Sequence, residues 1–265
     1  QVANLIGARP EEIYFTAGGS ESDNMALRGV VNASNKEKKH IITTKIEHHA
    51  ILHTAEYLEK KGVDVTYLEV DEFGRIRLDE LEQAIRPETV LISVMFANNE
   101  IGTIQPIREI GEIARKHGIL FHTDAVQAMP YISIDVKDIG CGMLSASGHK
   151  FGAPKGVGFL YANERSRIKP IINGGHQEDG KRPGTENVLG IIAMAAALED
   201  SVEHMDERNK HIKCLRDRLL ERLLQIPGSH LNGSLENRVH SNINIRFSGV
   251  SGAKLVTLCS LYGVY

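Results

Sequence analysis

The chain has 265 residues, of which 42% are hydrophobic and 25% charged, and its formal net charge is −3. That length is enough for one large domain, or for one domain and part of another. The near balance of charge argues against binding to nucleic acid or to a membrane surface, since both need a basic face, and no apolar run approaches the roughly 20 residues of a membrane span.

Short β-rich runs alternate with amphipathic stretches through most of the chain. The predicted strands are Glu12–Thr16, His40–Thr44, Asp64–Leu68, Val90–Met95, Leu120–Asp124, Met143–Ala146 and Gly158–Tyr161. Helices are predicted between them at Ala50–Lys61, Leu78–Ala84 and Ile107–His117. This alternation predicts right-handed βαβ crossovers, and hence an α/β fold with a mainly parallel sheet and helices on both faces.

The character of the sequence changes near residue 206. A long charged amphipathic helix is predicted at Glu207–Leu224, and a strand at Ser241–Phe247. We therefore expect a large domain over residues 1–205 and the start of a smaller α+β domain over residues 206–265. The first residue is not Met and the apolar pattern is unfinished at the last, so an internal fragment of a longer protein is expected.

Ligands of parallel α/β sheets gather at the carboxyl ends of the strands, where Asn99, Asp124 and the Gly18-Gly19 loop are expected to lie. The stretch Thr16–Asn24 passes from a strand into a helix through these glycines. Free N–H groups and the helix dipole could cradle a phosphate there, and Ser20 could add a hydroxyl. An ordinary strand-to-helix turn with a serine cap explains this stretch equally well.

A lysine and an aspartate carry the most chemical information in the chain. Lys150 follows Ser147 and His149, and Asp124 lies one predicted strand earlier. A lysine amine can hold an aldehyde cofactor as a Schiff base, and a carboxylate can keep a pyridinium nitrogen protonated, as pyridoxal phosphate (PLP) chemistry requires. Lys155 lies in the same glycine-containing segment, and spacing alone does not choose between the two lysines.

Two other patterns suggest sites that closer inspection does not support. His49 and His53 share a helix face, next to His48, but Ala50 stands where a zinc protease needs glutamate, so no metal site is predicted. The stretch Gly175–Arg182 matches a nucleotide phosphate loop except at its last position, where arginine replaces Ser or Thr. An exposed functional loop is expected there instead, in which Thr185 offers a hydroxyl.

The cysteines are scattered and odd in number, at Cys141, Cys214 and Cys259. This favours free thiols in a reducing compartment over a disulfide framework, and no signal peptide opens the sequence. A cytoplasmic protein is expected, with three inert and partly buried thiols.

Six motifs, in order along the chain, resemble those of the cysteine desulfurases, in the class V aminotransferase family of fold-type I PLP enzymes. They are Thr16–Asn24, Glu47-His48, Asn98–Glu100, Asp124–Gln127, Ser147–Lys150 and Gly184–Asn187. The resemblance implies the fold of these PLP-dependent transferases and a reaction that converts L-cysteine to L-alanine, with the sulfur held as a persulfide on an acceptor cysteine. The Gly175–Asn187 loop and the Asn242–Tyr265 segment look like the group that supplies sulfur for iron–sulfur cluster assembly. A homodimer that hands sulfur to an acceptor or iron–sulfur scaffold protein is therefore implied.

The resemblance also implies a role for each site residue. Lys150 would hold PLP and move the proton at the substrate α-carbon, Asp124 would pair with the ring nitrogen, and Gln127 would bond the phenolic oxygen. His48 would stack on the ring and assist proton transfer, and Asn99 would touch the cofactor or the substrate carboxylate. The phosphate would be held by Gly19, Ser20, Ser147 and His149, with Thr185 reaching the phosphate of the partner subunit's site.

The family's sulfur-accepting cysteine and its substrate-binding arginine are expected beyond Tyr265. Cys259 comes too early, within an apolar run, to be that cysteine. The 265 residues are thus expected to bind PLP without desulfurating cysteine, which would be the activity of the intact parent. A selenocysteine lyase or an aminotransferase of the same fold would share these motifs, and so would a catalytically silent module of a different functional class.

Overall fold

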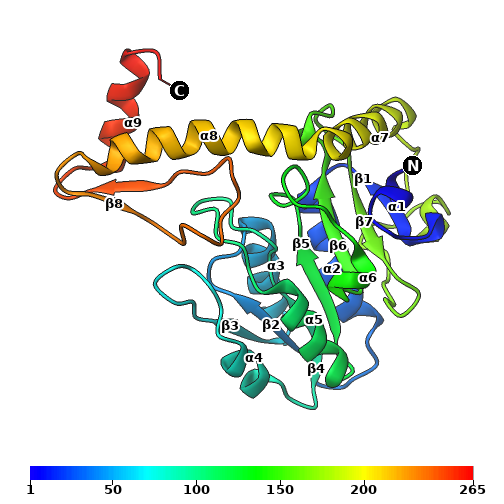
Figure 1. The fold of residues 1–265 in the computed structure, drawn as a ribbon. Coiled ribbons are helices and arrows are strands. Elements are labelled where there is room, and N and C mark those ends of the chain that lie inside the picture. Colours follow the sequence, from blue (N-terminus) through cyan, green and yellow to red (C-terminus); the bar gives the residue numbers. More distant parts are fainter. Residues whose placement is uncertain (265) are drawn as a thin grey trace.

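The computed structural model describes residues 1–264 and contains a seven-stranded sheet in the order β1-β7-β6-β5-β4-β2-β3 (Figure 1). Its strands are β1 (Ile13–Thr16), β2 (His40–Thr44), β3 (Asp64–Leu68), β4 (Thr89–Ser93), β5 (Leu120–Asp124), β6 (Met143–Ser147) and β7 (Gly158–Ala162). Strands β3, β2, β4, β5 and β6 run parallel to one another, whereas β7 is antiparallel to both β6 and β1. The prediction of a mainly parallel sheet is confirmed.

Apolar side chains cover both faces of the sheet, because successive residues of a strand point to opposite sides. Ile41 packs in a cluster with residues of α2 (Gly19–Ala33), and its neighbour Ile42 packs in a second cluster with residues of α5 (Ile107–Lys116). Both isoleucines are fully buried. Helices therefore lie on both faces, as predicted. The other helices are α1 (Val2–Leu5), α3 (His49–Glu59), α4 (Leu78–Ala84), α6 (Val136–Ile139), α7 (Val188–Glu203), α8 (Met205–Leu224) and α9 (Gly252–Leu261), with short 3₁₀ turns η1 (Pro10–Glu12), η2 (Gly148–Phe151) and η3 (Glu178–Gly180).

The predicted helices between the strands are present with small shifts at their ends, and several strand ends are also shifted, two of them at places where a side chain binds the backbone. Glu12 is the last residue of η1 instead of the first residue of a strand, because its Oε2 accepts the Arg9 N–H at 2.9 Å. Strand β4 ends at Ser93 and not at Met95. The N–H of Met95 donates to a buried carboxylate of Glu47 at 2.9 Å, so it is not used in strand pairing.

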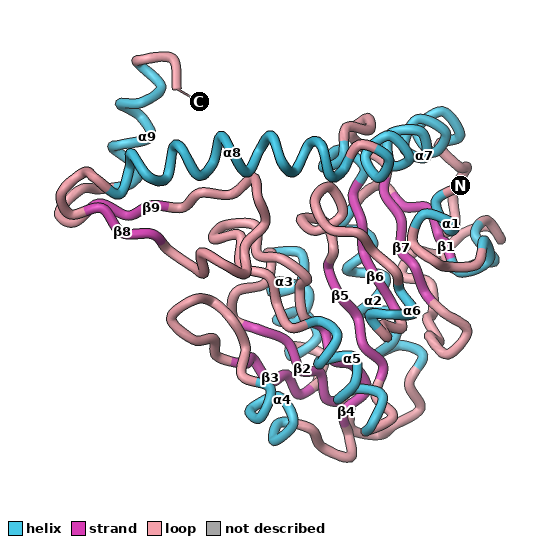
Figure 2. The backbone as a smooth tube through the Cα atoms, viewed as in Figure 1, coloured by secondary structure: helices cyan, strands magenta, loops and turns pink. Residues whose placement is uncertain are grey.

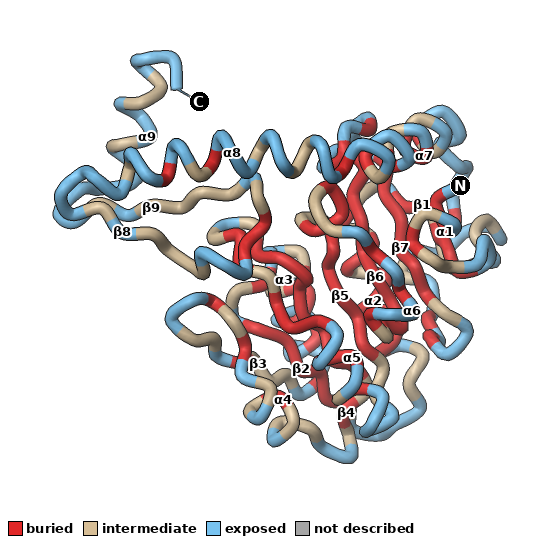
Figure 3. Tube along the Cα trace, viewed as in Figure 1, coloured by how far each residue is buried: buried red, intermediate tan, exposed pale blue. Residues whose placement is uncertain are grey.

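The C-terminal part of the chain is more exposed than the sheet and its helices (Figure 3). Helix α8 crosses the molecule and leads to a separate two-stranded sheet of β8 (Ser229–Leu231) and β9 (Ile245–Phe247), followed by α9 (Figure 2). The predicted strand over residues 241–247 was too long. Asn242 and Asn244 turn their side-chain amides to the Glu100 carbonyl, at 3.0 and 2.9 Å, and only the last three residues pair as a strand.

This C-terminal part contacts the main sheet's loops through a short segment around Arg238. The N–H of Val239 donates to the Gly102 carbonyl at 3.0 Å, and the N–H of Ile104 donates to the Asn237 carbonyl at 2.9 Å. The boundary proposed between residues 205 and 206 falls between α7 and α8 and stays a prediction. Among residues 1–264, no helix combines the length and the apolar character that a membrane crossing requires.

Candidate active site

A cavity of about 300 Å³ opens where several strands end. Asp124 ends β5, Ser147 ends β6, and Met95 follows β4, so neighbouring strands bring side chains from distant parts of the sequence to one place. The lining residues are Gly19, Ser20, Asp23, His48, Met95, Asn99, Asp124, Val126, Gln127, Ser147, His149 and Lys150. Every site residue predicted from the sequence is among them except Thr185.

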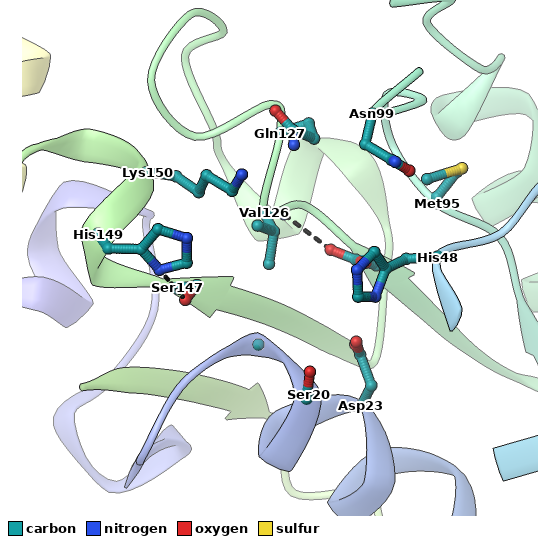
Figure 4. A pocket seen from close by; sticks show the side chains of 12 residues that line it. Ser20, Asp23, His48, Met95, Asn99, Val126, Gln127, Ser147, His149 and Lys150 are labelled. Carbon is teal, nitrogen blue, oxygen red and sulfur yellow. Dashed lines mark hydrogen bonds between the residues drawn. The ribbon is translucent and has the colours of Figure 1, made fainter. Parts of the chain in front are cut away.

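Lys150 and its rival Lys155 lie in different places. Lys150 is on η2 and extends into the cavity, with His48 and Asp23 on the opposite side (Figure 4). Lys155 lines a neighbouring hollow beside Gly18 and Ser20. Of the two lysines, the structure therefore brings Lys150 to Asp124 and Gln127.

The loop before α2 is shaped to approach an anion closely. Gly18 has φ 147°, a backbone conformation that favours glycine, and no side chain caps the helix that begins after it. A Cβ on Gly19 would come within 2.8 Å of Val126 Cγ2, so a larger residue would intrude on the cavity wall. The N-terminus of this 15-residue helix presents N–H groups and the positive end of its dipole. A phosphate would fit this position, and its binding here stays a prediction.

Ser147 and His149 lie beside this helix start and share a hydrogen bond of 3.0 Å between Oγ and Nδ1. Burial and the nearby cations Lys150 and Lys155 lower the pKa of His149. The imidazole is thus neutral near pH 7, and Nε2 can serve as a hydrogen-bond donor while Nδ1 accepts from the serine. Both side chains supply hydrogen-bonding groups to the same phosphate-sized space.

Asp124 is buried and lines the cavity, and its Oδ1 accepts the Val126 N–H at 2.9 Å. Burial raises its pKa, while the Val126 N–H and the electrostatic interactions with His48 and Lys150 oppose the rise. A buried carboxylate stabilised in this way is suited to pair with a cationic ring nitrogen.

His48 is the one histidine of its group that lines the cavity. It is the N-cap of α3, where its Nδ1 accepts the Ala50 N–H at 3.1 Å. His49 and His53 stack on each other, with ring centroids 4.9 Å apart. Across residues 1–264, the structure holds no group of three or more His, Cys, Asp or Glu side chains arranged to bind a metal ion.

Three lining residues were missed by the sequence analysis: Asp23, Met95 and Val126. Asp23 had an available signal, because it lies four residues after Gly19 on the same helix and therefore shares its face. Val126 lies within the Asp124–Gln127 motif. Met95 gave no signal of its own, since it reads as an ordinary apolar residue near the end of a strand.

Thr185 lines a separate hollow with Phe15, Glu178 and Arg182. Its loop is fixed to the main body by several polar contacts. Glu178 Oε2 accepts the Phe15 N–H at 3.1 Å, Arg182 Nε lies 2.9 Å from Glu21 Oε1, and Lys181 Nζ bonds the Tyr14 hydroxyl. No helix begins after Arg182 until Val188, in agreement with the view that this is not a nucleotide loop. The role of Thr185 stays a prediction.

The three cysteines lie away from the cavity lining. Cys141 is buried, and burial raises the pKa of its thiol to about 12, which leaves it inert. The expectation that all three are at least partly buried was wrong for Cys214, which is exposed on α8 because that helix turns much of its surface to solvent.

The residues of the cavity fit PLP in kind and position. The cavity wall includes an amine, a buried carboxylate, an amide and an aromatic ring, which belong to Lys150, Asp124, Gln127 and His48. The N-terminus of α2 also borders the cavity. These are the groups that an aromatic aldehyde with a ring nitrogen and a phosphate would need. The cavity volume of about 300 Å³ lies at the small end of the range found for small-ligand sites.

The sequence profile described as Aminotransferase class-V matches residues 1–265 of the chain. The chain is 51% identical over 265 residues to cysteine desulfurase IscS of Methanosarcina thermophila, covering 100% of this chain and 66% of that protein. It is 49% identical over 268 residues to cysteine desulfurase IscS of Clostridium botulinum, of which it covers 68%. A solved structure of a NifS-like protein superposes with a TM-score of 0.96 at 41% identity, covering 100% of this chain and 73% of that one. The chain thus spans about two thirds of the length of the curated relatives it matches.

Proposed function

Because this chain belongs to the class-V aminotransferase family, we propose that it binds PLP and forms the cofactor-binding part of a cysteine desulfurase. The observation that carries the proposal is a single cavity that holds Lys150, Asp124 and Gln127 together with a helix N-terminus. The relatives named cysteine desulfurase support the choice of reaction within the family. The proposed reaction takes sulfur from L-cysteine and leaves L-alanine.

Each residue has a task that its position supports. Lys150 would hold the cofactor covalently and move the proton at the substrate α-carbon, because its amine extends into the cavity. When bound, PLP would supply an electron sink for the bonds that break at the substrate. Asp124 would pair with the ring nitrogen and Gln127 would bond the ring oxygen.

The remaining residues would orient the cofactor and the substrate. His48 would lie against the ring and assist proton transfer, and Asn99 would contact the ring or the substrate carboxylate. The phosphate would be held by the start of α2 and by nearby side chains, namely Gly19, Ser20, Ser147 and His149.

The sulfur acceptor is proposed to be none of the three cysteines of this sequence. Cys141 is buried with a pKa of about 12, and neither Cys214 nor Cys259 lines the cavity among the residues described. We therefore expect the 265 residues alone to bind PLP without forming a persulfide. We also propose a homodimer, in which Thr185 completes the partner subunit's phosphate site, and transfer of sulfur to an acceptor protein such as an iron–sulfur scaffold.

Titration of the 265-residue protein with PLP tests the cofactor. A visible absorbance band at a longer wavelength than that of free PLP should form in the wild type and in Lys155→Ala. The band should be absent in Lys150→Ala. Loss of the band in Lys155→Ala with retention in Lys150→Ala would contradict the assignment.

The reaction itself is tested on the natural full-length protein, by measuring alanine and sulfide released from L-cysteine in the presence of a thiol reductant. Equal release of the two products supports a desulfurase. Amino transfer to a keto acid without any sulfide would show an aminotransferase instead, and turnover of selenocysteine alone would show a selenocysteine lyase.

A further inference from the structure

Three carboxyl groups lie buried in or near the cavity wall. Asp124 and Glu47 are each 5% exposed and Asp23 is 1% exposed, although charged side chains are seldom buried unless they are paired. Asp23 comes from α2, Asp124 from β5, and Glu47 from the turn after β2. Sequence patterns gave no reason to expect three acids in one buried region.

The nearest buried histidine does not neutralise these acids. His122 Nε2 lies 3.7 Å from Asp23 Oδ1, but both ring nitrogens are bonded to serine hydroxyls at 2.9 Å, Nδ1 to Ser93 and Nε2 to Ser145. Burial lowers the pKa of His122 to about 3. The ring is therefore neutral and supplies no positive charge to Asp23.

The three acids differ in what stabilises a negative charge. Asp124 has the Val126 N–H and favourable electrostatic interactions with His48 and Lys150. Asp23 Oδ1 has no hydrogen-bond partner among the residues described. Burial first, and then the charge of Asp124, hold the pKa of Asp23 well above its usual range, with Glu47 adding to the rise and the Ser145 hydroxyl opposing it.

Glu47 is also held in its neutral form. Its Oε1 accepts hydrogen bonds from Thr44 Oγ1 and from the Met95 N–H, both at 2.9 Å, yet burial raises the pKa of Glu47 to about 8. Unlike Asp23, it does not line the cavity.

We propose that Asp23 is a positioning residue that remains a neutral carboxylic acid, so that Asp124 carries the negative charge offered to the cofactor. The inference rests on the proposed binding of PLP in this cavity. An ionised Asp23 would repel Asp124 and would place a second negative charge beside the ring. A neutral Asp23 fills the wall with a polar group and leaves the position and charge of Asp124 undisturbed.

Substitutions at Asp23 distinguish whether its side chain acts as a neutral acid or as a charged carboxylate. Asp23→Asn has nearly the same shape and is always neutral, so its PLP affinity should stay within about threefold of the wild type, and the pH dependence of its visible band should be unchanged between pH 6 and 8. Asp23→Ala removes the polar group and should weaken PLP binding by about tenfold or more. A tenfold loss of affinity in Asp23→Asn, or a shift of its spectroscopic midpoint by about one pH unit, would overturn the inference.

A second measurement needs no cofactor. A buried acid with a raised pKa destabilises the fold increasingly as pH rises above the value of the unfolded chain. Apo Asp23→Asn should thus melt at a higher temperature than the apo wild type at pH 8, by roughly 4 °C or more, and at nearly the same temperature at pH 4. Glu47→Gln is the matched control for this assay, because it neutralises another buried acid and should show a rise of the same sign.

The two proposals fail in different ways. Absence of the visible band in the wild type would reject PLP binding, whatever the melting temperatures show. A wild type that binds PLP, together with an Asp23→Asn variant no more stable than the wild type at pH 8 while Glu47→Gln is stabilised, would reject a neutral Asp23. Equal PLP affinity of Asp23→Ala and the wild type would reject a positioning role.

Discussion

The Oε1 atom of Glu47 accepts the backbone N–H of Met95 at 2.9 Å, and this bond joins the turn after β2 to the point where β4 ends. Each segment contributes a residue to the cavity wall: His48 follows Glu47 in the first segment, and Met95 itself belongs to the second. The contact explains why β4 stops at Ser93, and it places a buried acid where a neutral form is favoured.

Glu47→Gln should stabilise the protein at alkaline pH. Burial raises the folded-state pKa of Glu47 from 4.5 to about 8, so the unfolded chain releases this proton first and the wild type loses stability as pH rises between these values. Glutamine removes that loss. The free energy of unfolding of the variant, relative to the wild type, should increase by about 3 kcal/mol from pH 5 to pH 8 and then level off. Urea unfolding across this pH range measures it, and a pH-independent difference would contradict it.

His122→Gln should weaken the acid sensitivity of the fold. Burial lowers the folded-state pKa of His122 to about 3, so the unfolded chain binds the extra proton and wild-type stability falls as pH drops below about 6.5. At pH 4.5 this loss amounts to about 2–3 kcal/mol, and glutamine, which can still bond Ser93 and Ser145, should avoid it. Acid denaturation curves test the effect. His211→Gln, at an exposed position on α8, is the control and should follow the wild-type curve.

Gly19→Ala should lower the affinity for PLP or inorganic phosphate by about tenfold. The new methyl group would come within 2.8 Å of Val126 Cγ2, at the cavity wall beside the start of α2. Val126→Ala should restore part of the affinity in the double variant, because it removes the atom that clashes. Binding isotherms for the two single variants and the double variant measure the coupling. Additive losses in the double variant would show that the clash is not the cause.

Thiol labelling of the folded protein should discriminate between Cys214 and Cys141. Cys214 is exposed, whereas Cys141 is buried with a pKa of about 12. At pH 8 an aromatic disulfide reagent should modify Cys214 quickly and should leave Cys141 unmodified until the protein is unfolded. Cys214→Ser should remove the fast phase. Rapid modification of Cys141 in the native protein would be inconsistent with the buried thiol described above.

Local patterns in the sequence were enough to predict most of the fold. Alternating apolar strands and amphipathic helices gave the mainly parallel sheet, because these periodicities reflect burial on one face or both. Several of the wrongly predicted strand ends lie where a side chain forms a hydrogen bond with a backbone group. Glu12 binds the Arg9 N–H, Glu47 binds the Met95 N–H, and Asn242 and Asn244 bond the Glu100 carbonyl, and each contact shortens or moves a predicted strand.

By itself the sequence determined the kind of chemistry, since a lysine, an aspartate and a glycine-containing helix start are recognisable from residue type and order. Spacing alone could not choose between Lys150 and Lys155, which only the family resemblance separated, and the sequence did not reveal the buried acids. Those points depend on which side chains meet at the ends of neighbouring strands, and on how much water is excluded there. The tertiary structure decided them, because burial and the distances between charges set the protonation of Asp23 and Asp124, and neither quantity is carried by a residue's place in the chain.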